Sequence, residues 1–239
     1  LRGKPVPRER MLEVAEHYQH FVGVSPINQQ NRELIQALSQ QLDDAGIDLP
    51  IYWGNRNWHP LLPEALEEMR RDGRRRAIAF FTSFFSCYSG CRQYRENVAD
   101  ARQQVGEGAP VVELVRKGFN HPLFIEAQVD LVRAALEQID AERRDAAKVL
   151  FTAHSIPLSM AEHSRYVVQL TEASRLVAES LQRQDWELVY QSRSGPPQQP
   201  WLEPDICDRI EQLAEEGVQD IVVVPIGFIS DHMEVMFDL

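Results

Sequence analysis

The chain has 239 residues, of which 44% are hydrophobic, 26% charged and 8% aromatic, as in ordinary globular proteins. A formal net charge of -11 argues against a general binder of nucleic acids or anionic membranes, because both partners are polyanions. Apolar runs are only a few residues long, far short of the roughly 20 residues that a membrane span needs.

Helix-like and strand-like patterns alternate in the first half of the chain. Apolar residues recur at helical spacing in residues 31–46 and 62–73, and each segment ends on a glycine, a common helix stop. Residues 77–82 predict a buried strand and residues 111–115 a second short strand. A helix that begins near Arg92 is expected between these two strands.

The second half repeats this alternation. A long helix begins at Pro122, where proline suits the first helical turn, and keeps its apolar residues near one face. A strand then ends at His154, and further helices and strands follow to the end of the chain. The predicted elements are helix 122–143, strand 148–154, helix 162–182, strand 186–192, helix 204–217 and strand 220–229.

This order of elements predicts the fold class. Apolar strands separated by amphipathic helices are typical of an α/β protein whose mostly parallel sheets are covered by helices on both faces. The pattern runs twice, so we expect two related lobes, residues 1–115 and 116–239.

Ionisable side chains follow two of the predicted strands. Ligand groups gather beyond the carboxyl ends of parallel strands, which is where His154, Asp231, His232 and Glu234 are expected. If the last segment is extended, His232 and Glu234 point the same way, because side chains alternate along a strand. Two histidines and a glutamate suit transition-metal binding or proton transfer. A hydrogen-bonded structural histidine, with Asp231 capping the following turn, is the alternative.

Residues 52–60, YWGNRNWHP, alternate aromatic and polar side chains ahead of a helix. Such a loop could bind a flat aromatic ligand, with Arg56 holding its carboxylates and the rings stacking on it. A loop that tucks Trp53 and Trp58 into the core explains the pattern equally well.

The three cysteines are Cys87, Cys91 and Cys207, an odd number that does not suggest a disulfide framework. Because disulfides are rare in cytosolic proteins, where thiols stay reduced, the lack of a disulfide framework predicts a cytoplasmic protein. Cys87 and Cys91 lie close in sequence, but only the distant Cys207 remains, so a four-cysteine metal cage is excluded and free thiols are favoured.

Six segments stand in a fixed order along nearly the whole chain. They are VGVSPIN (22–28), GNRNWHP (54–60), SGCRQYREN (89–97), FTAHSIP (151–157), YQSRSGPPQQPWLEPDI (190–206) and PIGFISDHMEV (225–235). Together they resemble the ferrochelatase family, most closely its bacterial, actinobacterial-like branch, which is associated with coproporphyrin rather than protoporphyrin.

The resemblance implies two Rossmann-like, chelatase-type lobes with a porphyrin cleft between them. It implies an enzyme, a lyase of heme biosynthesis that inserts ferrous iron into a porphyrin and releases two pyrrole protons. His154 and Glu234 then face the porphyrin centre and share metal binding and proton acceptance. His232 and Asp231 support Glu234 or a proton path.

The resemblance also implies porphyrin contacts at Ser25, Arg56, Trp201 and Arg2. No tightly bound cofactor is expected, since Fe(II) is a substrate. Cys87 lies close to a position that ligates a [2Fe-2S] cluster in some relatives, whose other cysteines sit in a C-terminal extension, so a cluster is expected only in a full-length form. A monomer without nucleic-acid partners or a transmembrane segment is expected.

The match lacks both ends of the family pattern. Family members begin with a strand that precedes the first residues here, and they continue past Leu239 into a final helical region. We therefore expect a chain truncated at both ends.

The leading hypothesis is a ferrochelatase that converts coproporphyrin III into coproheme. A non-catalytic tetrapyrrole-binding module and a cobalt or nickel chelatase of the same fold are the alternatives.

Overall fold

The computed structural model describes residues 8–20, 23–196 and 198–239. The chain divides into two compact units, one formed by Leu1–Leu49 with Ser230–Leu239 and the other by Pro50–Ile229. The division into lobes of residues 1–115 and 116–239 remains a prediction.

The first unit is helical. Helix α2 begins four residues earlier than the sequence pattern indicates and ends ahead of Gly46, whose φ of +68° suits a helix stop. The ring of His17 in α1 stacks on Phe237 at a centroid distance of 3.8 Å, which ties the last residues to the first helix. The helices are α1 (Arg8–His20), α2 (Ile27–Asp44) and α10 (Met233–Met236).

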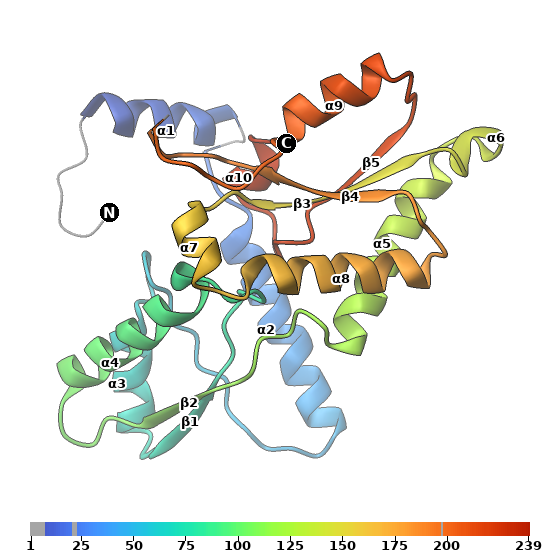
Figure 1. Cartoon of the computed structure of the whole chain (residues 1–239). Coiled ribbons are helices and arrows are strands. Elements are labelled where there is room, and N and C mark those ends of the chain that lie inside the picture. The colour runs from blue at the N-terminus through green and yellow to red at the C-terminus, as the bar shows by residue number, and fades with distance from the viewer. Residues whose placement is uncertain (1–7, 21–22, 197) are drawn as a thin grey trace. The chain divides into compact units, whose positions relative to one another are not determined.

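A parallel three-stranded sheet of order β4-β3-β5 forms the core of the second unit. Helices α5 and α8 lie on one side of this sheet and α9 on the other (Figure 1). Alternate residues of β3 face opposite sides, so Phe151 belongs to the core cluster with α5 and α8 while Leu150 belongs to the cluster with α9. Both residues are fully buried. The elements are β3 (Lys148–His154), β4 (Trp186–Gln191), β5 (Ile221–Val224), α5 (Pro122–Glu137), α8 (Tyr166–Ser180) and α9 (Ile206–Glu215).

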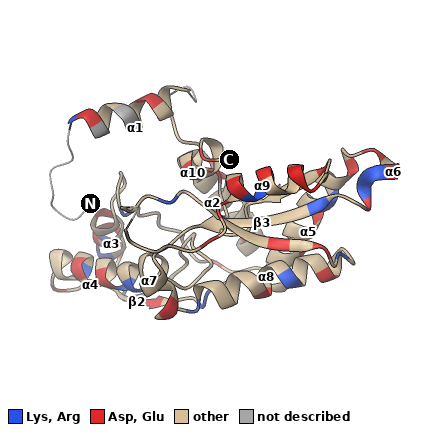
Figure 2. Ribbon diagram, turned by 45° about the horizontal axis from the view of Figure 1, so that its top comes forward, with Lys and Arg blue, Asp and Glu red and all other residues tan. Residues whose placement is uncertain are grey.

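This sheet confirms the predicted fold class, parallel strands flanked by helices. The outer side of α9 is acidic and carries Asp208, Glu211 and Glu215, all exposed (Figure 2). Acidic helix surfaces of this kind account for much of the negative net charge. Among the described residues, no helix combines the length and the apolar character needed to cross a membrane.

A second, two-stranded parallel sheet pairs β1 with β2. The prediction of a buried strand over residues 77–82 is wrong in two respects. The strand ends at Ala79, and Ile78 is 74% exposed, because alternate side chains of a strand point to opposite faces and this face is open. The elements of this part are α3 (Leu62–Arg71), β1 (Arg76–Ala79), a π-helical turn (Tyr88–Arg92), α4 (Gln93–Val105) and β2 (Val111–Leu114).

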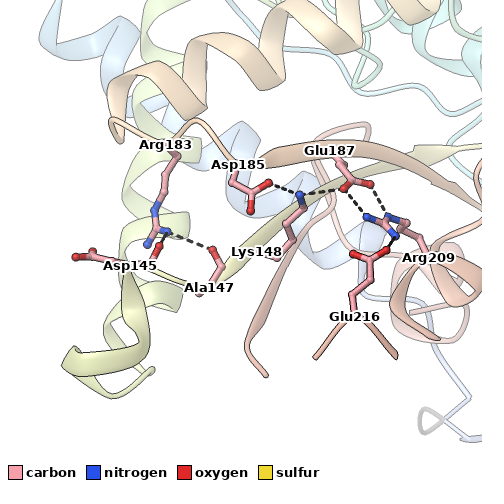
Figure 3. A network of polar contacts seen from close by, with 8 residues as sticks. All are labelled: Asp145, Ala147, Lys148, Arg183, Asp185, Glu187, Arg209 and Glu216. Atoms are coloured by element: carbon pink, nitrogen blue, oxygen red, sulfur yellow. Dashed lines mark hydrogen bonds and ion pairs between the residues drawn. The ribbon is translucent and has the colours of Figure 1, made fainter. Parts of the chain in front are cut away.

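Two short helices, α6 (Ala141–Arg144) and α7 (Leu158–Glu162), complete the second unit. The loop after α6 is held by Arg183, whose guanidinium donates to the carbonyls of Asp145 and Ala147 at 3.0 and 3.2 Å (Figure 3).

An ionic network lies at the amino ends of β3 and β4, the edge of the sheet opposite His154 (Figure 3). Glu187 accepts two hydrogen bonds from Arg209, at 2.7 and 2.8 Å, and pairs with Lys148 at 2.9 Å. Lys148 also pairs with Asp185, and Arg209 with Glu216. The hydrogen bonds from Arg209, together with Lys148, lower the pKa of Glu187 to about 2.

We expect Glu187→Gln to destabilise the protein by about 2 kcal/mol at pH 7, because the depressed pKa reports preferential stabilisation of the charged carboxylate in the folded state. This contribution is fully present above the unfolded-state pKa near 4.5 and is lost as the pH falls toward 2. Urea unfolding of wild type and variant should therefore show a difference that shrinks by roughly half between pH 6 and pH 3.

Glu216→Gln is the matched control. Glu216 is 56% exposed and contacts the same arginine, so its loss should cost no more than about 0.5 kcal/mol. An equal destabilisation by Glu187→Gln at pH 6 and pH 3 would show that packing, not charge, explains the effect.

Candidate functional site

The backbone around His154 is fixed on several sides at the carboxyl end of β3. The Tyr166 hydroxyl donates to the His154 carbonyl at 3.1 Å, and Ser155 N donates to the Gln191 carbonyl at 2.8 Å. On the side of β5, Gly227 N donates to the Thr152 carbonyl at 3.1 Å. The strand thus delivers His154 to a defined position at the sheet edge, as the sequence predicts.

The imidazole of His154 is half-buried, and its Nδ1 contacts the carbonyl oxygen of Ser155. A carbonyl can only accept, so Nδ1 is the protonated nitrogen in the neutral ring. The lone pair of the neutral ring then lies on Nε2, the form that accepts a proton or binds a transition metal.

A buried polar pair lies in the sheet beside His154. Thr152 Oγ1 donates to Gln191 Oε1 at 2.6 Å, and both residues are at most 1% exposed. Sequence reasoning missed Gln191 as part of this region. The sequence contains a signal for it, because a polar residue that follows the apolar stretch 188–190 of a strand must find a buried hydrogen-bond partner.

The segment containing Trp201 lies beside the residues that follow His154. Pro157 and Trp201 form an antiparallel bridge, and Ser155 Oγ donates to the Leu202 carbonyl at 2.8 Å. The Trp201 Nε1 atom is buried and has no hydrogen-bond partner within the described residues. A Cβ added at Gly195 would come within 2.3 Å of that nitrogen, so only glycine fits there. The indole N–H points into protein, so a porphyrin contact by Trp201, still a prediction, would use the ring.

Arg56 lies against the π-helical turn. Its Nη1 donates to the Ser89 carbonyl at 3.4 Å, and its guanidinium lies 5.1 Å from the centroid of the Tyr94 ring. The alternative in which both tryptophans of this loop are buried is wrong, because Trp58 is 68% exposed and only Trp53 is half-buried.

The first unit contains the second group of predicted site residues, Asp231, His232 and Glu234. Its structure contradicts the prediction that this segment is extended. His232 and Glu234 do not lie on one extended segment, since Met233–Met236 form the helical turn α10. His232 caps this turn: its Nδ1 accepts from Glu234 N at 3.2 Å, and its carbonyl accepts from Val235 N and Met236 N. Strand alternation therefore does not apply. The His232 Nδ1 atom and Glu234 Oε2 are 3.9 Å apart.

Asp231 does not cap the turn, because His232 does. Its backbone N–H donates to Gln30 Oε1 at 2.8 Å, and Gln30 Nε2 donates to Asp231 Oδ2 at 3.2 Å. This double contact anchors the segment to helix α2, and no local sequence pattern indicates the role of Gln30. Near the start of the same helix, Ser25 Oγ accepts from Ile27 N at 3.4 Å. Arg2 lies outside the described residues.

The structure therefore brings Asp231, His232 and Glu234 together in the first unit. It places His154 beside the Trp201 segment in the second. That His154 and Glu234 face one porphyrin remains a prediction.

Comparison with known proteins identifies the family. A ferrochelatase family model matches residues 2–239. The chain belongs to the ferrochelatase family. It is 62% identical to a ferrochelatase of Rhodopirellula baltica and 52% identical to a coproporphyrin III ferrochelatase of Nocardia farcinica. Both matches cover 100% of the chain, and 68% and 70% of the respective relatives. A coproporphyrin III ferrochelatase of Streptomyces coelicolor is 49% identical over the whole chain.

Family membership confirms the prediction of an enzyme, a lyase that inserts a metal into a porphyrin. It also confirms the resemblance of the six sequence segments to the ferrochelatase family.

The environment of Cys87 bears on a [2Fe-2S] cluster in this ferrochelatase. The sulfur accepts a hydrogen bond from Gly90 N at 3.2 Å and caps the π-helical turn, and Ser89 Oγ also lies 3.2 Å from it. Within the described part of the chain, no three His, Cys, Asp or Glu side chains are placed to hold one metal ion. The residues present therefore do not make a cluster site, and Cys87 serves as a helix cap.

Proposed function

We propose that this ferrochelatase inserts ferrous iron into coproporphyrin III and forms coproheme. The observation that carries the proposal is the match over the whole chain, at 52% and 49% identity, to relatives named coproporphyrin III ferrochelatases. Arg56, which the family resemblance places at the porphyrin, is a cation that can pair with a carboxylate of either porphyrin, so it supports porphyrin binding in general.

His154 is proposed to act on the pyrrole nitrogens. With its proton on Nδ1, the neutral ring presents the Nε2 lone pair, which can take a pyrrole proton or coordinate Fe(II). The fixed backbone at the end of β3 holds this group in place.

Glu234 is proposed as the partner of His154. A carboxylate can neutralise the metal as it sheds water and can accept the second proton. His232 holds the backbone of Glu234 through its Nδ1, and Asp231 fixes the segment to Gln30, so both are proposed as positioning residues.

The test compares porphyrins and metals under anaerobic conditions. We expect kcat/KM for Fe(II) insertion to be at least about tenfold higher with coproporphyrin III than with protoporphyrin IX. One charge-assisted hydrogen bond made only to coproporphyrin III would be worth roughly 1.4 kcal/mol, which corresponds to a factor of about ten in rate. Loss of porphyrin fluorescence and the absorbance of the metallated product give the rates. Co(II), Ni(II) and Zn(II) are assayed in parallel.

Equal rates with both porphyrins would overturn the substrate assignment. Faster insertion of Co(II) or Ni(II) than of Fe(II) would instead favour the alternative of a different metal chelatase. Porphyrin binding without any metallated product would favour a non-catalytic binding module.

A further inference from the structure

A cavity of about 370 Å³ lies at the carboxyl ends of β1 and β2. Its walls come from the residues that follow the two strands and from the π-helical turn with the start of α4. None of His154, Arg56 or Trp201 lines it. Its size falls within the range of pockets that bind small organic molecules, roughly 300–1,000 Å³.

The charged lining of this cavity is entirely basic. It contains Arg95, Arg116 and Lys117 and no Asp or Glu. The whole chain carries an excess of acidic over basic residues, 36 against 25, so this lining is a local exception. Burial lowers the pKa of Lys117, and the nearby charge of Arg95 lowers it further, against the opposite effect of Cys91 and Cys87. An anion would relieve this repulsion between cations.

Hydrogen-bond donors remain available on these cations. Lys117 Nζ donates to the carbonyls of Ser83, at 2.6 Å, and Gly90, which leaves one of its three donors. Arg116 uses one nitrogen, Nη1, to contact Asn120 Oδ1 at 2.9 Å and the Lys117 carbonyl at 3.1 Å. Within the described residues, Arg95 forms neither a hydrogen bond nor an ion pair, so its guanidinium keeps all five donors.

The remaining wall is aromatic and well packed. Phe84 contacts Phe80 edge to face at a centroid distance of 5.8 Å, and its ring lies so close to Gly118 that an added Cβ would be 2.8 Å away. An apolar wall beside cations suits a ligand with an aromatic or aliphatic body and an anionic end.

We propose that this cavity binds a small organic anion, an aryl or alkyl phosphate or carboxylate, at a site separate from that of the porphyrin. The anionic group contacts Arg95, Arg116 and Lys117, and the apolar body packs on Phe80 and Phe84. The proposal goes beyond porphyrin metalation and does not depend on it.

The experiment is isothermal titration of the full chain with phenyl phosphate as probe, in the absence of porphyrin and iron. We expect submillimolar binding, at least about tenfold weaker binding of inorganic phosphate, and none of benzylamine, which has a similar apolar body and the opposite charge. Arg95→Gln should weaken phenyl phosphate binding at least about fivefold.

Arg92→Gln is the matched control. Arg92 lies three residues away, does not line the cavity, and is 77% exposed in an ion pair with Glu96. Its replacement should change affinity less than about twofold. Circular dichroism melts of both variants verify that each is folded.

Three results would overturn the proposal. They are no binding of phenyl phosphate to the folded wild type, equal affinity in wild type and Arg95→Gln, and, in a separate competition titration without iron, displacement of the bound probe by stoichiometric coproporphyrin III. The last result would assign the cavity to the porphyrin site. Because the titration contains no iron, its outcome is independent of whether the chain metallates coproporphyrin.

Discussion

His154→Ala is expected to lower the rate of Fe(II) insertion at least about 100-fold, while the affinity for coproporphyrin III changes less than about threefold. The first estimate is the usual size of general acid–base catalysis by a positioned side chain. The second follows because the substitution removes a group proposed to act at the reacting nitrogens, and the backbone contacts of Tyr166 and Ser155 are retained. Fluorescence quenching measures binding, and anaerobic absorbance assays measure metalation.

His163→Ala serves as the matched control. The His163 Nδ1 atom also lies against a backbone carbonyl, that of Ser159 at 2.8 Å, but the side chain is exposed in the turn after α7. Its loss should leave the rate within about twofold of wild type. Free imidazole should restore part of the metalation rate of His154→Ala. It should leave the rate of His163→Ala unchanged. Normal metalation by His154→Ala would show that another group accepts the pyrrole protons.

Gly227→Ala is expected to destabilise the second unit by about 3 kcal/mol, the upper part of the range for overpacking a buried site. A Cβ at this position would lie 2.6 Å from Ala153 Cβ and 2.8 Å from Ala153 Cα. These atoms belong to a fully buried residue near the carboxyl end of β3, which cannot shift without disturbing its pairing with Tyr190 of β4. Urea unfolding of the two proteins gives the difference in free energy.

A double-mutant cycle with Ala153→Gly separates steric conflict from other causes. Removing the Ala153 Cβ should recover roughly 1 kcal/mol or more of the loss caused by Gly227→Ala. The recovery is partial because the Ala153 Cα still lies close to the added methyl group. Strictly additive effects would mean that the cost has a different origin.

Local periodicity predicted the main elements of the fold well. Helix 204–217 is observed as α9, Ile206–Glu215, and strand 148–154 is observed as β3 with the same bounds. Alternating apolar strands and amphipathic helices are visible in sequence because burial repeats with the period of each element. The face of β1 that carries Ile78 was mispredicted, because an apolar run does not tell which side of a short strand is covered.

Some features of the candidate site could be predicted from the sequence and others could not. His154 could be placed at a strand end from the pattern alone, but the π-helical cap formed by Cys87 and the turn capped by His232 could not. The contact between Gln30 and Asp231 joins residues 201 positions apart. Such contacts depend on tertiary packing that no local pattern records, and a short segment such as Met233–Met236 is ambiguous between strand and helix.

The open face of the small sheet has a consequence for solution behaviour. Ile78 and Val111 expose apolar side chains on strands that would invite stacking by a second molecule. Across the same face, Arg76 and Glu113 form an ion pair at 2.7 Å, which places two charges among the apolar groups. Burying that pair in a stacked dimer would strip both ions of water, so the charges of Arg76 and Glu113 oppose stacking on this face.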